Sequence, residues 1–412
     1  GKNMKKNHLS ALSRCLEKRK LTGTLRSLTR TPVDLVDFSS NDYFGLAQCP
    51  QLQQEVSREI GCNSVLAQLG STGSRLLSGN SAYAEKLESM ISSYHDGDSA
   101  LLFNSGFDCN YGLFSSVPQS GDIVIYDSLA HNSIREGVKA SRATGIAFDH
   151  NCMKSLEYLL ESLPNCSRPP SNLPTPSEEC ATALPCNVFI SVESVYSMDG
   201  DVAPLRAIVE LAQRYQAAVI VDEAHGLGVL GSGGRGLVHH LGLSDDVFAT
   251  VYTYGKAMGA HGACVVGDTI LRDYLLNYSR PSIYSTALPG HSLATISCGY
   301  RVLDNHAEKL QQLLRCRIES FRSSFFQEAP TSGLRLLPST TAVQAVLVPG
   351  GNEAVTGLAS ALRDRGFAVL PIRAPTVPAG KERLRVCLHV HNTESQVRSL
   401  AAAIVELSSQ FE

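Results

Sequence analysis

Short apolar runs alternate with helical patterns through most of the chain. Each run is bounded by glycine or polar residues, as is typical of strands buried on both faces of a parallel sheet. Between the runs, as at 152–163 and 205–216, apolar residues recur every three or four positions, which favours amphipathic helices. This alternation predicts an α/β fold with a mostly parallel sheet covered by helices. The predicted strands span 99–103, 122–127, 187–194, 217–225, 247–256 and 262–267.

The two ends of the chain show other patterns. Near the start, Leu9, Leu12 and Leu16 recur at helical spacing, and a short extended piece follows. Beyond about residue 300 the order changes to helix, strand, helix, strand, which indicates a smaller α+β domain. A stretch rich in Pro, Ser and Thr favours no regular element and is expected to be a surface insertion. The predicted parts are 1–47 (N-terminal helix and extended segment), 48–300 (large domain, with the insertion at 164–187) and 301–412 (C-terminal α+β domain).

Composition places the chain among ordinary globular proteins. Its 412 residues are 43% hydrophobic and 18% charged, and a formal net charge of −3 gives no basic surface that would point to nucleic acid. No apolar run reaches the length of a membrane span, the first residues lack the apolar core of a secretory signal, and the last three differ from a peroxisomal address. We therefore expect a cytoplasmic protein with small-molecule substrates and no membrane partner, with a peroxisome or mitochondrion as open alternatives.

The 12 cysteines are scattered and include no C-x-x-C pair, which argues against structural zinc. Without a secretory signal, buried free thiols are their expected state. No metal site is predicted.

Ionisable side chains follow two of the predicted strands. One apolar run ends in Asp222, Glu223 and His225, and a later run delivers Thr253 and Lys256. Open α/β sheets bind their ligands at the carboxyl ends of the strands. Taken singly, Asp222 has the cap of a turn as an alternative explanation, and Lys256 is more simply explained as a solvated lysine. A lysine acts as a nucleophile when burial or neighbouring charge lowers its pKa.

The pair matches the needs of pyridoxal phosphate. An aspartate keeps the pyridine nitrogen protonated so that the ring withdraws electrons, while a lysine amine binds the aldehyde. Gly106 and Phe107 open a predicted helix after a strand, where backbone N–H groups can bind a phosphate. His131 follows another strand and is suited to stacking on an aromatic ring, although a lone histidine is more often structural.

Residues 226–231 spell the G-x-G-x-x-G pattern of dinucleotide-binding proteins after a strand. That fingerprint requires a turn that opens at once into a helix. Four of the six residues at 231–236 are glycine, which disfavours a helix, so a nicotinamide cofactor is not expected.

Nine blocks in the same order resemble the α-oxoamine synthases, which are fold-type I pyridoxal-phosphate enzymes. The resemblance runs from about residue 19 to 405 and is strongest to the branch that makes 8-amino-7-oxononanoate for biotin. It implies a large sheet domain of seven strands, a smaller C-terminal domain and a homodimer with shared active sites. The blocks are FSSNDYFGLA, GSTGSRLLSGN, SGFDCN, YDSLAHNSIREG, SVYSMDGDVAPL, VDEAHGLGVLG, TYGKAMGAHGA, IYSTALP and PIRAPTVPAGKERLRV.

The resemblance implies a role for each matching residue around the cofactor. Lys256 would bind it covalently, Asp222 would contact the ring nitrogen, and His131 would stack over the ring and, like His225, is a possible general acid. The remaining cofactor contacts implied are Ser197 and His225 at the ring hydroxyl, Gly106, Phe107 and Thr253 at the phosphate, and Thr286 at the phosphate of the neighbouring subunit.

Substrate contacts are implied in the same way. Arg373, with Thr376 close by, matches the arginine that pairs with the amino-acid carboxylate, for which a planar two-pronged donor is suited. Asn41 and Ser78 align with positions near the substrates. Arg26 lies where relatives carry an arginine near the distal carboxylate of pimeloyl-CoA. Alternatively, Arg373 forms a surface ion pair and Arg26 is a solvated helix-end residue.

The implied reaction is a decarboxylative condensation of L-alanine with pimeloyl-CoA, an acyl transfer that yields 8-amino-7-oxononanoate, CoA and CO2. Glu223 stands in place of a second aspartate, His261 follows the lysine at an unfamiliar position, and the insertion has no counterpart in compact relatives. These departures bear on the choice of acyl chain. The alternatives are a relative that uses glycine and acetyl-CoA, a secondary-metabolite synthase that takes another acyl thioester, or an inactive partner subunit.

Overall fold

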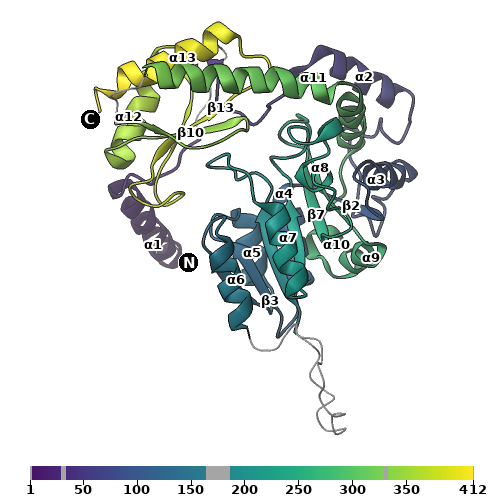
Figure 1. Cartoon of the computed structure of the whole chain (residues 1–412). Coiled ribbons are helices and arrows are strands. Elements are labelled where there is room, and N and C mark those ends of the chain that lie inside the picture. Colours follow the sequence, from purple (N-terminus) through teal and green to yellow (C-terminus); the bar gives the residue numbers. More distant parts are fainter. Residues whose placement is uncertain (1, 29–33, 164–185, 329–332, 412) are drawn as a thin grey trace. The chain divides into compact units, whose positions relative to one another are not determined.

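The structure of the protein is a computed structural model that describes residues 2–28, 34–163, 186–328 and 333–411. The chain forms two compact units (Figure 1). All but residues 186 and 187 of the expected insertion lie outside the described residues. The large unit comprises residues 41–197 and 201–312, and the small unit comprises residues 1–40, 198–200 and 313–412.

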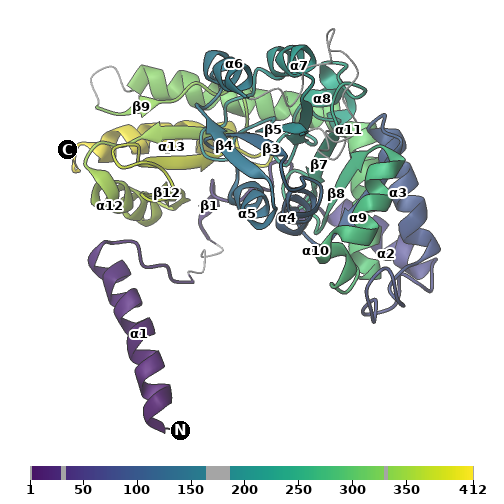
Figure 2. The same ribbon diagram turned by 90° about the horizontal axis from the view of Figure 1, so that it is seen from below.

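A seven-stranded sheet forms the centre of the large unit, in the order β2-β8-β7-β6-β5-β3-β4 (Figure 2). Only β8 runs against the others, pairing antiparallel with both β2 and β7. The predicted mostly parallel sheet is therefore confirmed, and each of the six predicted strands forms. The seventh, β4, lies at the edge of the sheet and is largely exposed, so its sequence lacks the apolar run that marks the others. The strands are β2 (Ser99–Phe103), β3 (Ile123–Asp127), β4 (Thr144–Phe148), β5 (Val188–Glu193), β6 (Ala218–Asp222), β7 (Ala249–Thr253) and β8 (Ala263–Gly267).

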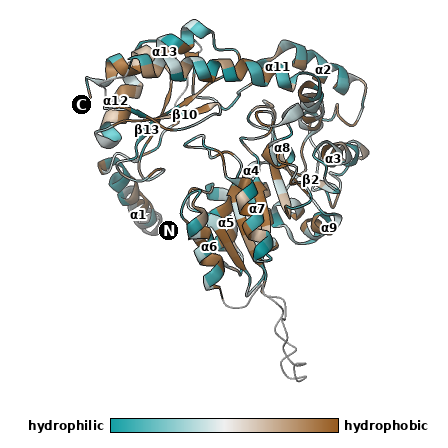
Figure 3. Cartoon of the chain, in the orientation of Figure 1, coloured by the Kyte–Doolittle hydropathy of each residue, from teal (hydrophilic) through white to brown (hydrophobic). Residues whose placement is uncertain are grey.

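Helices cover both faces of this sheet, because alternate residues of each strand point to opposite sides. On one face Ile190 and Val221 pack with α6, α7 and α8, and on the other Phe189 and Ile220 pack with α4, α5 and α9. The strands appear as apolar bands beneath helices with polar outer faces (Figure 3). The helices of this unit are α2 (Pro50–Gly61), α3 (Ala82–Tyr94), α4 (Gly106–Ser116), α5 (Asn132–Ala140), α6 (Met153–Ser162), α7 (Leu205–Arg214), α8 (Leu237–His240), α9 (Thr269–Tyr278) and α10 (Arg280–Ile283).

The small unit contains an antiparallel sheet, β12-β13-β10-β9, and a separate parallel pair, β1 with β11. The N-terminal extended segment thus pairs with a strand from the far end of the chain. The long helix α11 (Gly290–Glu328) starts in the large unit and continues into the small one. No helix within the described residues is long and apolar enough to cross a bilayer. The remaining elements are α1 (Lys2–Leu21), β1 (Val36–Asp37), β9 (Arg335–Leu336), β10 (Val343–Leu347), α12 (Gly351–Asp364), β11 (Phe367–Ala368), β12 (Leu370–Ile372), β13 (Arg383–Cys387) and α13 (Glu394–Ser408).

The glycine-rich stretch after β6 folds around a buried carboxyl group. Glu223 is fully buried and accepts a hydrogen bond of 2.8 Å from the Val238 N–H. Burial raises the pKa of Glu223 to about 7, partly offset by its hydrogen-bond donors. Gly236 has φ +97°, and a Cβ there would approach the Glu223 carboxyl to 2.7 Å. Gly226, the first glycine of the 226–231 pattern, likewise leaves room for the Glu223 carboxyl, so packing around this buried side chain accounts for both glycines.

Replacing Gly236 with alanine should destabilise the large unit by about 2–4 kcal/mol, because a strained φ is combined with a steric clash. Gly242→Ala is the matched control, since Gly242 also has a positive φ (+67°) but nothing lies within 4 Å of its Cβ position. Gly242→Ala should lower the free energy of unfolding by only about 1 kcal/mol. Urea denaturation measures the free energy of unfolding of both variants. Equal losses of stability would show that the Glu223 carboxyl does not restrict position 236.

Candidate active site

Four parallel strands end at one edge of the large sheet with polar or charged side chains. Asp222 ends β6 and lies in register with Glu193, the last residue of β5. Thr253 ends β7 and Asp127 ends β3. All four side chains are buried. Because the carboxyl ends of parallel strands meet at the same edge, the sheet itself gathers these groups.

The carboxylate of Asp222 is held at both oxygen atoms. Asn110 on α4 donates to Oδ2 at 2.7 Å, and the Ala224 N–H donates to Oδ1 at 2.8 Å. The same Asn110 amide also donates to Ser133 at 3.1 Å. Hydrogen bonds of this kind favour the charged form and fix its orientation. Asp222 is therefore a buried carboxylate held at both oxygens rather than a simple turn cap.

His131 caps the N-terminus of α5 beside this carboxylate. Its Nδ1 lies 2.7 Å from Ser133 Oγ, and its backbone N–H donates to Glu193 at 2.6 Å. Burial lowers the pKa of the His131 imidazole; the Asp222 charge opposes that shift, and the Lys256 charge adds to it. The imidazole therefore lies within electrostatic reach of both Asp222 and Lys256 and is neutral at physiological pH.

Lys256 follows β7 by three residues and is partly buried. Its Nζ donates to Thr253 Oγ1 at 3.1 Å. Burial raises the pKa of Glu193 well above its usual value; Asp222 adds to that rise, whereas the His131 N–H and Lys256 oppose it. Glu193 is thus the carboxyl of this group whose charged form burial disfavours most clearly. The solvated alternative for Lys256 does not hold, since the amine is oriented among buried polar groups.

A small polar cradle lies next to Lys256. Gly106 is the first residue of α4, and Ser105 caps this helix by accepting from the Asp108 N–H. A Cβ at position 106 would come within 2.6 Å of Thr253 Cγ2, so only glycine leaves the space open. The N–H groups of Gly106 and Phe107 have no partner inside the helix, which makes this end suited to a phosphate. The predicted phosphate contacts therefore come together.

His225 is joined to the N-terminal part of the large unit. Its Nδ1 lies 2.7 Å from the hydroxyl of the buried Tyr43, which in turn lies 3.4 Å from Asn41 Oδ1. Ser197 is half-buried and lies between β5 and α7. Asn41 thereby connects to His225 through Tyr43.

Thr286 and Ser78 belong to a second cluster with exposed side chains. The Thr286 carbonyl accepts from Asn104 at 2.8 Å, and the neighbouring Ala287 N–H donates to Gly73 at 2.9 Å. Ser78 Oγ lies 3.4 Å from Thr72. A pocket that includes Gly79, Asn104 and Thr286 opens here.

The other predicted substrate residues lie in the small unit. Arg373 follows β12, is partly buried and donates to the Gly23 carbonyl at 2.9 Å. Its own carbonyl accepts from the Thr376 N–H at 2.9 Å. Arg26 is exposed. Arg373 has no ion pair within the described residues, and the substrate roles of all three residues stay predictions.

One group of side chains in the small unit has the composition of a metal site, although no metal was predicted. Potential ligand atoms of Asp37, His389 and His391 lie within 4.8 Å of one another. Hydrogen bonding already explains two of them: Asp37 Oδ1 accepts from the Ser39 and Ser40 N–H groups, and the ring of His389 lies 3.0 Å from the Ser40 carbonyl.

Sequence reasoning missed Asn110, Glu193 and Tyr43. Asn110 lies four residues after Gly106 on one helix, a spacing that places both on the same face. Glu193 ends a predicted strand, as Asp222 does, so the register of parallel strands could have revealed it. Tyr43 lies far from His225 in sequence and carries no such signal.

The sheet and the groups at its edge define a fold-type I pyridoxal-phosphate enzyme. Residues 33–404 match the family described as aminotransferase class I and II. The chain is 41% identical to the 8-amino-7-oxononanoate synthase of Emericella nidulans, with 94% of this chain and 92% of the relative covered, and 35% identical to that of Chlorobaculum parvum, with 91% and 90% covered. The chain belongs to the class I and II aminotransferase family and, within it, to the α-oxoamine synthases.

The fold comparison agrees. Serine palmitoyltransferase of Sphingomonas wittichii superposes with a TM-score of 0.84 at 24% identity, with 98% of this chain and 99% of that one covered. That likeness concerns the fold. The family match and the 41%-identical relative show that the protein is a pyridoxal-phosphate-dependent enzyme of the acyltransferase type.

The residues at the strand edge fit this cofactor. A buried anion held at both oxygens suits a protonated ring nitrogen, an amine among buried groups suits an aldehyde, and the cradle at Gly106 suits a phosphate. The charge and shape of the protein at these three points therefore match the ring nitrogen, aldehyde and phosphate of one pyridoxal-phosphate molecule.

Replacing Asn110 with alanine should weaken pyridoxal-phosphate binding about tenfold or more, because Asp222 loses a hydrogen bond to its charged carboxylate. Asn277→Ala is the matched control, since Asn277 is exposed on α9 and donates only to the Asp273 carbonyl. Equilibrium dialysis of the cofactor measures both variants. Unchanged affinity in Asn110→Ala would show that Asp222 needs no orienting partner.

Proposed function

We propose that the protein condenses L-alanine with pimeloyl-CoA, releasing CoA and CO2 and forming 8-amino-7-oxononanoate, a step of biotin synthesis. The observation that supports this most is the placement of Asp222 and Thr253 at the ends of the paired strands β6 and β7, with the Lys256 amine donating to Thr253. His131 caps α5 after β3, and its imidazole interacts electrostatically with both Asp222 and Lys256. The choice of substrates is supported by the 41% identity to the 8-amino-7-oxononanoate synthase of Emericella nidulans, over 94% of the chain.

The bound cofactor would act as an electron sink for the negative charge that develops at the α-carbon of the amino acid. The residues of the chain supply the remaining functions. Lys256 Nζ, oriented by Thr253, would remove the proton from that carbon and later return one. Asp222 would keep a proton on the ring nitrogen, and the neutral His131 would cover the ring face and serve as a hydrogen-bond partner at the thioester carbonyl.

The remaining predicted residues would bind and orient the two substrates. Arg373 would pair with the carboxylate of alanine, with Thr376 beside it, and Arg26 would approach the distal carboxylate of the pimeloyl chain. Asn41 would act near the amino acid through the Tyr43–His225 connection. Ser78 would likewise lie near the substrates.

Pairwise assays of alanine, glycine and serine with pimeloyl-, acetyl- and palmitoyl-CoA test the proposal. Alanine with pimeloyl-CoA should give by far the highest kcat/KM, with 8-amino-7-oxononanoate as the product by mass spectrometry. Lys256→Ala should lower the rate at least about a thousandfold, because the proton acceptor is lost. Lys309→Ala, an exposed lysine on α11, should leave the rate unchanged.

A preference for another thioester or amino acid would assign the chain to a different member of the α-oxoamine synthases. Failure of all nine pairs while the cofactor binds normally would contradict a condensing activity altogether.

The proposal includes a homodimer in which Thr286 serves the site of the neighbouring subunit. Lys256→Ala and Thr286→Asp chains carrying different affinity tags can be expressed together and the hybrid dimers purified. If the sites are shared, each hybrid has one site with both changes and one with neither, so about half of the wild-type activity per dimer returns. If Thr286 serves its own subunit, both sites of the hybrid are damaged and no activity returns.

A further inference from the structure

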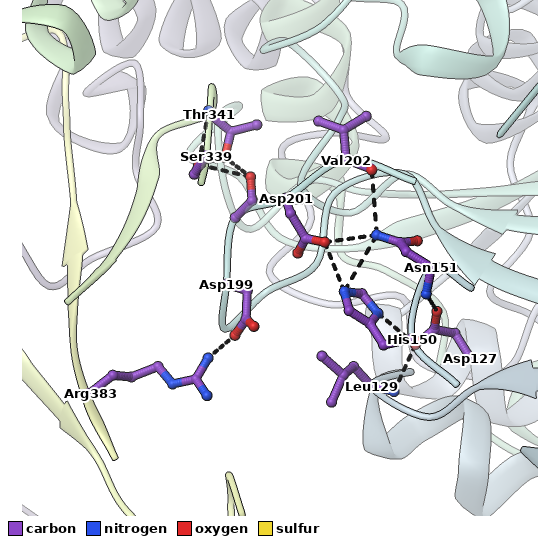
Figure 4. Close-up of polar contacts among 11 residues, drawn as sticks. Asp127, Leu129, His150, Asn151, Asp199, Asp201, Val202, Ser339, Thr341 and Arg383 are labelled. Carbon is purple, nitrogen blue, oxygen red and sulfur yellow. Dashed lines mark hydrogen bonds and ion pairs between the residues drawn. The ribbon is translucent and has the colours of Figure 1, made fainter. Parts of the chain in front are cut away.

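A histidine outside the cofactor site joins two carboxylates in the large unit (Figure 4). His150 lies between β4 and α6. Its Nδ1 is 2.9 Å from Asp127 Oδ1, and its Nε2 is 2.8 Å from Asp201 Oδ2. The ring of Tyr196 packs edge-on against it, with centroids 4.4 Å apart. Both ring nitrogens therefore face carboxylate oxygens.

Asp127 fixes the segment that leads to His131. Its fully buried side chain accepts from the N–H groups of Leu129 and Asn151 at 2.8 and 2.9 Å. Its carbonyl accepts from the Ala130 N–H at 2.8 Å. Asp127 therefore holds the turn between β3 and His131, and the bond from the His131 N–H to Glu193 completes it.

Asp201 similarly fixes the turn that carries Ser197. Its carbonyl accepts from the Tyr196 N–H at 3.0 Å, which brings the two ends of the turn together. Its carboxylate also accepts from the Asn151 side chain at 2.7 Å. His150 and the adjacent Asn151 therefore both connect the segment of His131 with the turn of Ser197, and His150 is the member of this pair that can carry a positive charge.

The charges around His150 favour its protonated form. Burial alone would lower the pKa of its imidazole, but the hydrogen bonds and charges of Asp127 and Asp201 raise that pKa to about 9. The buried Tyr196 facing it has a raised pKa and stays neutral. Without a positive charge here, Asp127 would be a fully buried carboxylate that lacks a counter-ion, which is unfavourable.

We propose that His150 is a positively charged positioning residue, which holds the segment of His131 and the turn of Ser197 in the arrangement that binds the cofactor. This inference rests on the proposed cofactor roles of His131 and Ser197. It explains why a half-buried histidine lies between two carboxylates of different segments.

The sign of the pH dependence follows from the raised pKa. The stabilisation by protonated His150 is complete below about pH 6.5 and is lost as the pH rises through about 9. Cofactor affinity should weaken over the same interval, because the two segments lose their shared cation.

His150→Gln tests the role, since glutamine keeps hydrogen-bonding capacity but not the charge. We expect pyridoxal phosphate to bind about tenfold to a hundredfold more weakly at pH 7.5. The variant should also lack the weakening that the wild type shows near pH 9. His306→Gln, an exposed histidine on α11, is the matched control and should behave as the wild type. Unchanged cofactor affinity in a folded His150→Gln variant would overturn the inference.

Nuclear magnetic resonance of 15N-histidine-labelled protein supplies a measurement that needs neither substrate nor activity. The resonances missing from His150→Gln identify His150, whose ring should stay protonated at pH 8. If that variant does not fold, Asp201→Asn serves instead. The histidine whose pKa changes in Asp201→Asn is then assigned to His150, and that pKa should be lower than in the wild type by about one unit or more. A His150 ring that titrates near 6.5 in the wild type would refute the charged role. Cofactor affinity and the His150 titration do not depend on which substrates the enzyme uses. The inference can therefore be tested even if the condensation assays fail.

Discussion

A buried carboxylate, Asp222, held by hydrogen bonds at both oxygens is the constraint on which the ligand-binding edge of the large sheet depends. Asp222 is 5% exposed, and a charge so far from water is tolerated only when it is paired and hydrogen-bonded. Asn110 and the Ala224 N–H supply hydrogen bonds to both oxygens of this carboxylate. The strand order supplies the rest, because β5, β6 and β7 lie side by side and end at one edge. Fold and chemistry thus share one cause: the sheet brings together charges that no exposed surface would hold so firmly.

Much of this could be predicted from the sequence. Continuous apolar runs mark the buried strands, and the polar residues that end those runs identify the ligand-binding edge of the sheet. That pattern marks Asp222, Thr253 and Lys256 as candidate site residues, and the resemblance to the α-oxoamine synthases adds the other candidates. Strand β4 has no such pattern, because an exposed edge strand lacks a continuous apolar run.

The partners that fix these side chains could not be predicted, for physical reasons. The Tyr43–His225 and His150–Asp201 contacts join residues far apart along the chain, and no periodicity encodes such pairs. Glu223 stands out in the sequence as a departure from the family near the cofactor, yet it is the buried core of a glycine-rich turn. The pairing of β1 with β11 likewise depends on the folded small unit.

The central claim is that Asp222 and Lys256 act on one pyridoxal-phosphate ring. A crystal structure of the cofactor-loaded enzyme tests it most directly. The account predicts continuous electron density from Lys256 Nζ to the cofactor, with an Asp222 oxygen within about 3 Å of the ring nitrogen. Density that joins the cofactor to another lysine, or a ring nitrogen that faces away from Asp222, would contradict it.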